Sequence, residues 1–220
     1  MAASAVPPDP LPRRVSRRAL LAGGLGVAGL AVGIGVPVTL QVLRRSGKLV
    51  PELLEADRFS VGHHGASADW PEMSMEAYRQ AVDHGVDALE VSLARSADGV
   101  WFGLHDATLD RTSGTTNFVA SDHAWAEIQQ LRINPTGRND TSGTPQAYLP
   151  FEDLVSTYAA THTIFVDPKV VPRAHYPELL ALMDAATEKP NDNFIAKAYG
   201  TTTVWADAAH SRGYRTWGYY

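Results

Sequence analysis

The stretch Ala88-Leu89-Glu90-Val91-Ser92-Leu93 is the first of two apolar runs that decide the fold, and the second is Val100-Trp101-Phe102-Gly103-Leu104-His105. Short apolar runs rich in Val, Leu and aromatic residues, bounded by turn residues, are typical of buried β-strands. Asp98-Gly99, between the two runs, is a turn signal. The segment therefore predicts two strands joined by a tight turn.

The short distance between these runs predicts how they pair. A crossover between parallel strands usually needs a dozen or more residues, and only about six separate the runs, so the segment taken alone predicts an antiparallel hairpin. A two-residue turn would place Ser92 opposite His105, with Glu90 one diagonal step away on the same face. In a hairpin or in a tight crossover, these three side chains are expected to converge.

The rest of the chain alternates between strand and helix patterns. Further strand-like runs occur at residues 59–63, 163–167, 194–198 and 214–217. Helical patterns occur at residues 75–82, 122–131, 176–188 and 204–211, and Pro150 opens another helix. Strands that alternate with helices predict a parallel α/β fold, either a barrel or a doubly wound sheet.

The composition is that of a folded, acidic domain. Hydrophobic residues make up 45% of the 220 residues and charged residues 20%, close to the globular average. Residues 51–220 hold 12 Lys or Arg against 23 Asp or Glu, and no basic stripe with interleaved aromatic residues is present, so nucleic-acid binding is not expected. The absence of cysteine excludes disulfides, thiolate metal ligands and a cysteine nucleophile.

The first fifty residues have the pattern of a membrane address. Residues 1–18 are basic, and Ser16-Arg17-Arg18-Ala19-Leu20-Leu21 resembles a twin-arginine export signal. Residues 19–43 predict a hydrophobic helix that serves as a signal or transmembrane anchor, because about 20 apolar residues suffice to span a bilayer core. No clear cleavage site follows, which favours a retained anchor with the next domain outside the cytoplasmic membrane; cleavage would give a secreted domain.

A linker is expected at residues 44–57, and the region 58–220 then contains a set of short motifs in one order. The motifs are His63-His64-Gly65-Ala66-Ser67, Pro71-Glu72, Glu90, Asp98-Gly99, His105-Asp106, Leu109-Asp110-Arg111-Thr112 and Asp167-Pro168-Lys169. In order and spacing this set resembles the glycerophosphodiester phosphodiesterase family. The resemblance implies a TIM barrel that hydrolyses glycerophosphodiesters to glycerol phosphate and an alcohol, using a divalent cation.

The resemblance also implies roles for individual residues. His63 and His105 match the two acid/base histidines, whose ordinary pKa of about 6.5 suits proton transfer near neutral pH. Glu90 and Asp167 match the carboxylates that bind the cation, Mg²⁺ or Ca²⁺, through hard oxygen ligands. Lys169 matches a lysine that binds the phosphate of the substrate.

Two positions depart from the family pattern. His64 occupies a phosphate-binding position where the family normally has Arg, so a bidentate, permanently charged clamp is missing. Ser92 occupies a metal-binding position where the family normally has Asp, and a neutral hydroxyl is a poorer ligand for a hard cation. Weaker phosphate and cation binding is expected.

The number of predicted strands is a third departure. Barrels of this type need eight strands in about 250 residues, whereas this sequence predicts about six. We therefore expect an incomplete barrel, truncated at its C-terminus, with open sheet edges at residues 59–63 and 214–220.

Two other functions fit the same pattern. One is a non-catalytic binding domain at the cell surface, favoured by His64, Ser92 and the missing strands. The other is a related phospholipase D that acts on lysolipids or sphingomyelin, for which a membrane tether would be convenient. The expected partners are therefore a small glycerophosphodiester or lysophospholipid and, through residues 19–43, a membrane.

Overall fold

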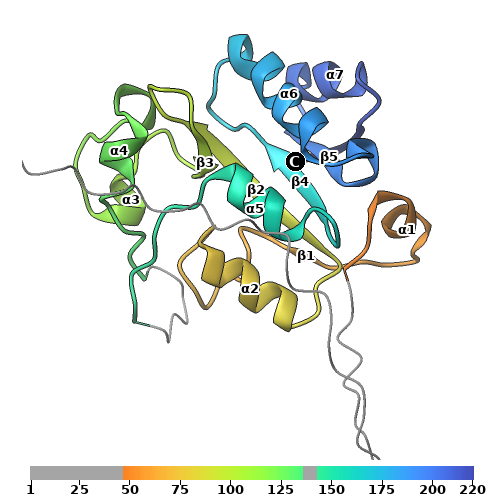
Figure 1. Cartoon of the computed structure of the whole chain (residues 1–220), viewed down its shortest axis with the longest axis horizontal. Coiled ribbons are helices and arrows are strands. Elements are labelled where there is room, and N and C mark those ends of the chain that lie inside the picture. The colour runs from red at the N-terminus through yellow and green to blue at the C-terminus, as the bar shows by residue number, and fades with distance from the viewer. Residues whose placement is uncertain (1–46, 136–142) are drawn as a thin grey trace, which may run out of the picture. The chain divides into compact units, whose positions relative to one another are not determined.

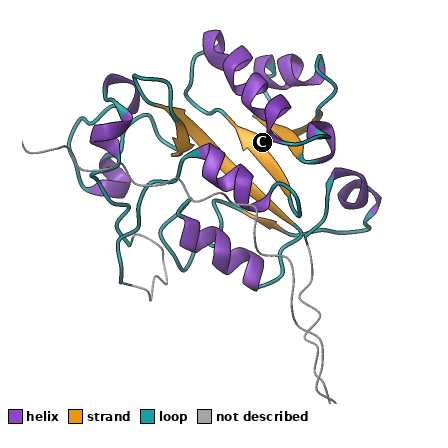
Figure 2. Ribbon diagram, viewed as in Figure 1, coloured by secondary structure: helices purple, strands orange, loops and turns teal. Residues whose placement is uncertain are grey.

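A sheet of six strands forms the centre of the domain in the computed structural model, which describes residues 47–135 and 143–220. Five strands run parallel in the order β1-β2-β4-β5-β6, and β3 pairs antiparallel with β2 (Figure 2). The strands are β1 Val61–Gly62, β2 Ala88–Arg95, β3 Trp101–Gly103, β4 Thr163–Asp167, β5 Phe194–Tyr199 and β6 Arg215–Tyr219. This parallel half-barrel confirms the predicted TIM-barrel-like α/β class.

The pairing of β2 with β3 confirms the predicted hairpin and corrects its register. Ser92 O accepts a hydrogen bond from Leu104 N–H at 2.9 Å, so Leu104 and not His105 lies opposite Ser92. The turn contains three residues rather than two, and Gly99 adopts a φ of 96°, a left-handed conformation that glycine reaches without steric cost. The longer turn shifts the register by one residue and leaves His105 in the loop after β3.

Four helices cover the outer face of the sheet (Figure 1). They are α2 Met75–Asp83, α5 Phe151–Tyr158, α6 Tyr176–Ala186 and α7 Val204–His210. The side chain of Ser74 caps α2 by accepting a hydrogen bond from Ala77 N–H at 3.1 Å, and Pro150 precedes α5. Leu89, Val91 and Leu93 of β2 face these helices in the largest apolar core, because alternate residues of a strand share one face.

The inner face of the sheet is apolar at the amino ends of the strands, where a further helix packs. Helix α1, Val50–Glu55, buries Val50 and Leu53 against Ala88, Phe165 and Ile195. This helix lies within the linker expected at residues 44–57, so that part of the expected linker belongs to the folded domain. Two buried side chains give only a weak helical pattern in the sequence. The helix is stable because the sheet supplies the apolar surface that these side chains cover.

The segment between β3 and α5 is called the insertion here, and its described residues, 104–135 and 143–149, pack around a separate core. It contains α3 Asp110–Ser113, the 3₁₀ turn Ala120–Asp122 and α4 Trp125–Ile128, so the helix expected at 122–131 is shorter than predicted. Its buried side chains include Leu104, Leu109, Ile128, Ile133 and Tyr148. In Figure 1, α3 and α4 lie together, away from α6 and α7. His105 lies in the loop between β3 and α3. Two further 3₁₀ turns, Arg173–His175 and Pro190–Asp192, precede α6 and β5.

The two ends of the sheet are edge strands. Within the described residues, β1 and β6 each have one neighbouring strand, as the sequence predicted for residues 59–63 and 214–220. Residues 1–18 and the hydrophobic segment 19–43 lie outside the described residues. Within residues 47–135 and 143–220, no helix combines the length and the hydrophobicity that a membrane span requires.

Candidate active site

Polar side chains gather on the inner face of the sheet, at the carboxyl ends of the strands. Glu90 and Ser92 share this face in β2, Ser92 pairs in register with Asp167 at the end of β4, and Lys197 follows in β5. The apolar layer described above lies on the same face at the amino ends. In TIM-type barrels the carboxyl ends of the strands carry the functional residues, so this polar layer is the candidate site.

A tight turn after β1 brings His63 and His64 to this layer. His64 has a φ of 52° and Gly65 a φ of 75°, and a Cβ at Gly65 would come within 2.8 Å of the backbone carbonyl carbon of Ala77. A left-handed conformation at a non-glycine residue costs free energy, so the surrounding contacts must hold it. The turn stacks the two imidazole rings with their centroids 4.0 Å apart.

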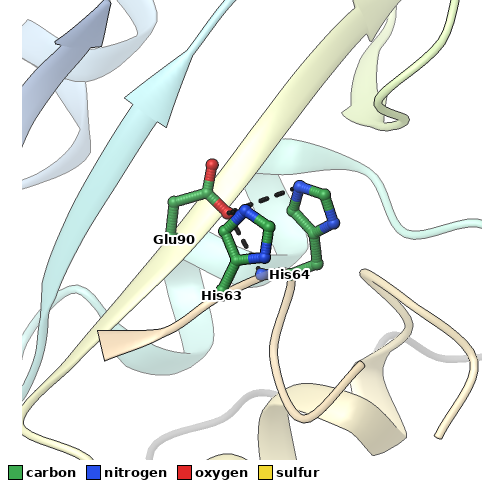
Figure 3. Close-up of side chains that lie close together, drawn as sticks. All are labelled: His63, His64 and Glu90. Carbon is green, nitrogen blue, oxygen red and sulfur yellow. Dashed lines mark hydrogen bonds and ion pairs between the residues drawn. The ribbon is translucent and has the colours of Figure 1, made fainter. Parts of the chain in front are cut away.

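Glu90 is the carboxylate at the centre of the site. Its Oε2 accepts a hydrogen bond from His64 N–H at 3.1 Å and lies 3.6 Å from His64 Nε2 and 4.0 Å from His63 Nε2 (Figure 3). Its Oε1 accepts a hydrogen bond from Lys197 Nζ at 2.7 Å and lies 3.4 Å from Ser92 Oγ. Burial alone would raise the pKa of this side chain, but His64 and Lys197 outweigh burial and hold the pKa below its ordinary value.

A second carboxylate, Asp167, is paired with Lys169 and Tyr219. Lys169 Nζ lies 3.3 Å from Asp167 Oδ2 and donates to Tyr219 Oη at 2.6 Å, while Tyr219 Oη donates to the same carboxylate oxygen at 3.1 Å. Lys169 Nζ and Lys197 Nζ lie 4.8 Å and 4.7 Å from the centre of the Tyr219 ring. Although burial favours the neutral amine, these partners raise the pKa of Lys169.

His105 reaches the same cluster from the loop after β3. Its ring centroid lies 5.4 Å from that of His64, and its Nδ1 is 2.8 Å from Asp106 Oδ1. Arg111 donates to Asp106 at 2.6 Å and holds Glu72 through two further hydrogen bonds. Burial would raise the pKa of Asp106, but Arg111 and His105 lower it, so this side chain is an ionised acceptor that orients His105.

The two stacked histidines differ in environment. His64 is buried, and burial, only partly opposed by Glu90, lowers its pKa to about 4. The His63 side chain is 65% exposed, and partial burial together with the nearby lysines lowers its pKa against the opposing effect of Glu90. Because solvent screens an exposed ring, we expect only a small shift for His63. Both imidazoles are therefore neutral at neutral pH.

The carboxylates fit Mg²⁺ or Ca²⁺ poorly in this arrangement. Lys197 already holds Glu90, and Lys169 already holds Asp167. Ser92 adds a neutral hydroxyl instead of a third carboxylate. Hard cations bind sites rich in anionic oxygen, and here each carboxylate is already neutralised by an ammonium group.

Histidine nitrogens beside Glu90 offer a second set of possible metal ligands. In the described part of the chain, one group of three metal-ligating side chains (His, Cys, Asp or Glu) has all its ligand atoms within 4.8 Å of one another. It consists of His63, His64 and Glu90. Figure 3 shows the two rings and the carboxylate converging on one point between β1 and β2. This group offers two nitrogens and one carboxylate.

The structure brings together all seven residues that the sequence singled out, in two linked groups. One group contains His63, His64, Glu90, Ser92 and His105, and the other contains Asp167 and Lys169. Lys197 and Tyr219 connect the groups and were missed by sequence reasoning. Lys197 interrupts an apolar strand at an inward position, which is a signal that could have identified it; Tyr219 gave no such signal.

Comparisons with known proteins identify the family and the fold to which this chain is similar. The model of the glycerophosphoryl diester phosphodiesterase family matches residues 63–201. The probable glycerophosphodiester phosphodiesterase 1 of Mycobacterium tuberculosis (strain ATCC 25618 / H37Rv) is 34% identical over 124 residues, which are 54% of this chain and 45% of that protein. The chain therefore spans less than half the length of this curated relative.

Solved structures share the fold. A glycerophosphoryl diester phosphodiesterase from Parabacteroides distasonis superposes with a TM-score of 0.61 at 22% identity, over 79% of this chain and 61% of that one. An Oleispira antarctica phosphodiesterase in complex with the product sn-glycerol-3-phosphate superposes with a TM-score of 0.57 at 15% identity, over 73% and 64%. With a family match over residues 63–201 and this fold, the chain belongs to the glycerophosphoryl diester phosphodiesterase family.

Proposed function

We propose that this chain hydrolyses glycerophosphodiesters to glycerol phosphate and an alcohol. The observation that carries the proposal is that His63 and His105 both lie against the ring of His64, with His63 Nε2 4.0 Å from the Glu90 carboxylate. Membership of the phosphodiesterase family supports the substrate class, and a structural neighbour is described with the product sn-glycerol-3-phosphate.

The proposed chemistry divides proton transfer between the two histidines. His63 is the base that removes a proton from the hydroxyl of the attacking water, because its lowered pKa leaves its exposed ring neutral near pH 7. His105 is the acid that protonates the leaving alkoxide, and Asp106 at 2.8 Å from Nδ1 orients the ring. Lys169 and His64 are the phosphate-binding groups of this proposal.

A divalent cation, Mg²⁺ or Ca²⁺ at Glu90, Asp167 and Ser92, is the finer part of the proposal. When bound, such an ion would neutralise charge that develops on the phosphoryl group. The pairing of both carboxylates with lysines opposes it, so we expect weak binding and a partial dependence of the rate on the cation.

A direct assay tests the activity. Purified protein is incubated with glycerophosphocholine, alone and with Mg²⁺ or Ca²⁺, and the release of glycerol phosphate is followed. Lysophosphatidylcholine and sphingomyelin in parallel test the phospholipase D alternative. Binding of these compounds without turnover under every condition would replace hydrolysis by the binding-domain function.

We also propose that residues 19–43 hold the domain at the outer face of the cytoplasmic membrane. The support is the uncharged apolar run between flanking arginines and the twin-arginine-like motif before it. Fractionation with protease shaving of intact cells tests this location. Full-length protein in the cytosol, protected from external protease, would exclude it.

A further inference from the structure

The triad formed by His63, His64 and Glu90 has the ligand atoms of a transition-metal site. Glu90 Oε2 lies 3.6 Å from His64 Nε2 and 4.0 Å from His63 Nε2, and all three ligand atoms lie within 4.8 Å of one another. Ligands at about 2.0–2.1 Å from a tetrahedral Zn²⁺ lie roughly 3.4 Å apart. Shifts of about 1 Å, with rotation of the two rings out of their stacked arrangement, would bring these side chains around one ion.

The chemistry of the three ligands selects the class of cation. Two imidazoles and one carboxylate are the protein ligands of many catalytic zinc sites, which keep a fourth position open. Imidazole suits Zn²⁺, Co²⁺ and Ni²⁺, whereas Mg²⁺ and Ca²⁺ require oxygen. Lys197 repels every cation near Glu90. This repulsion offsets most of the attraction between Glu90 and an ion that binds only electrostatically. An ion that also forms bonds to nitrogen keeps the stabilisation from those bonds.

The backbone places both rings at the triad through an unfavourable conformation. Consecutive residues of an extended strand point to opposite faces, so two neighbouring histidines do not ordinarily face one carboxylate. Here His64 adopts a φ of 52°, which stacks its ring on that of His63 with an interplanar angle of 22°. Residues held in sparsely populated conformations cluster at functional sites.

We propose that a transition-metal cation of the Zn²⁺ class binds to His63, His64 and Glu90 and inhibits the hydrolytic reaction. The inhibitory part rests on the proposed function, in which His63 Nε2 accepts a proton from the attacking hydroxyl. A nitrogen bonded to a metal ion has no lone pair for that proton. The same residues thus make a regulatory site in which the metal and the proton compete for one atom.

Binding is tested without substrate, on the full chain. Isothermal titration with Zn²⁺ is expected to show one ion per chain, bound more tightly than Mg²⁺ or Ca²⁺, and Co²⁺ should give a visible absorption band typical of tetrahedral coordination. His64→Arg, which restores the charge expected at this position in the family, should weaken Zn²⁺ binding at least about 100-fold, more than loss of an outer-shell partner typically costs. His63→Ala changes an exposed residue, so a variant that folds is available for the same measurement.

A matched control separates this site from adventitious binding at surface histidines. His123 Nδ1 lies 3.5 Å from Glu127 Oε1, so His123→Ala removes another histidine–carboxylate pair and should leave Zn²⁺ affinity unchanged. Wild-type affinity in His63→Ala or His64→Arg would overturn the proposed site.

The inhibitory effect is tested with glycerophosphocholine. Zn²⁺ should lower the rate with a midpoint that matches the calorimetric Kd, and a chelator should restore it. Activation by Zn²⁺, or a rate unaffected at saturating Zn²⁺, would overturn the inhibition. If no hydrolysis occurs under any condition, the proposed function fails, while calorimetry and the Co²⁺ spectrum still decide whether the metal site exists.

Discussion

Two single-residue variants test the two proposed proton-transfer roles. His63→Ala and His105→Ala are each expected to lower kcat for glycerophosphocholine at least about a hundredfold, the usual scale for losing general acid or base assistance. Steady-state kinetics on the purified variants measures this. His84, His162 and His175 lie outside the cluster, and their replacement by alanine should change kcat little. A near-normal kcat in His63→Ala or His105→Ala would mean that the acid/base pair lies elsewhere.

The pH dependence of the reaction reports on His63. Partial burial and the neighbouring lysines lower its pKa, so the ring remains neutral and able to accept a proton as the pH falls below 6.5. We expect the acidic limb of kcat/KM, measured between pH 4 and 8, to have its midpoint below 6.5. In Lys197→Met the repulsion from the ammonium group is absent, and the midpoint should move up. An acidic limb with its midpoint above pH 6.5 in the wild type would contradict the assignment of His63 as the base.

Ser92 tests whether a hard-cation site can be restored. Its Oγ lies 3.4 Å from Glu90 Oε1, so a carboxylate introduced by Ser92→Asp would face the same point as Glu90. Ser92→Asp is expected to tighten Mg²⁺ or Ca²⁺ binding, because an anionic oxygen replaces a neutral one, although repulsion between carboxylates reduces the gain. Calorimetric titration of both proteins, with Glu90→Ala as the control that abolishes binding, measures the effect. Unchanged affinity in both variants would exclude a hard cation here.

At the scale of secondary-structure elements, Asp87 ties the start of β2 to the chain before β1. It accepts hydrogen bonds from Ser60 N–H at 2.8 Å and Ser60 Oγ at 2.9 Å and forms an ion pair with Lys48. Burial would raise the pKa of Asp87, but these partners lower it. Its ionised form therefore stabilises the fold above the unfolded pKa of about 3.9, and this stabilisation is lost as the pH falls through the lower, folded pKa.

Asp87→Asn should consequently lower the free energy of unfolding by about 1–3 kcal/mol at pH 7, since the half-buried Lys48 loses its counter-ion. Urea unfolding at pH 7 and at pH 3 measures the difference between the variant and the wild type. The difference should shrink at pH 3, where the wild-type carboxylate is becoming protonated. Asp192→Asn, in a 3₁₀ turn that has no buried residues, is the control. An equal difference at both pH values would contradict the role of the charge.

At the scale of the whole domain, the sheet is most stable at its centre. Every residue of β4 is buried between β2 and β5, whereas β6 has one neighbour and mostly exposed side chains. Local opening is easiest where few apolar contacts and few shared hydrogen bonds must break. Hydrogen exchange followed by mass spectrometry should therefore show slow exchange in β2 and β4 and fast exchange in β6. Equal protection of β6 would mean that another surface covers this edge in solution.

The sequence alone determined the features that depend on local order. Alternation along β2 put Glu90 and Ser92 on one face, because the two-residue period of a strand is a property of its own backbone. The motif order likewise singles out His63, His105 and Asp167 as candidate site residues without reference to the fold. The parallel class followed from strands that alternate with helices, each marked by its own apolar period.

Tertiary structure alone decided which distant groups meet. Lys197 lies 107 residues after Glu90 in the sequence, and only the order β2-β4-β5 brings its ammonium group to 2.7 Å from that carboxylate. The left-handed turn at His64 sets the direction in which its imidazole points, and the left-handed turn at Gly99 sets the register of the β2–β3 hairpin. A register shift of one residue moves every side chain of a strand to the opposite face of the sheet. Pairings of this kind depend on the packing of the whole sheet, which no local sequence period encodes.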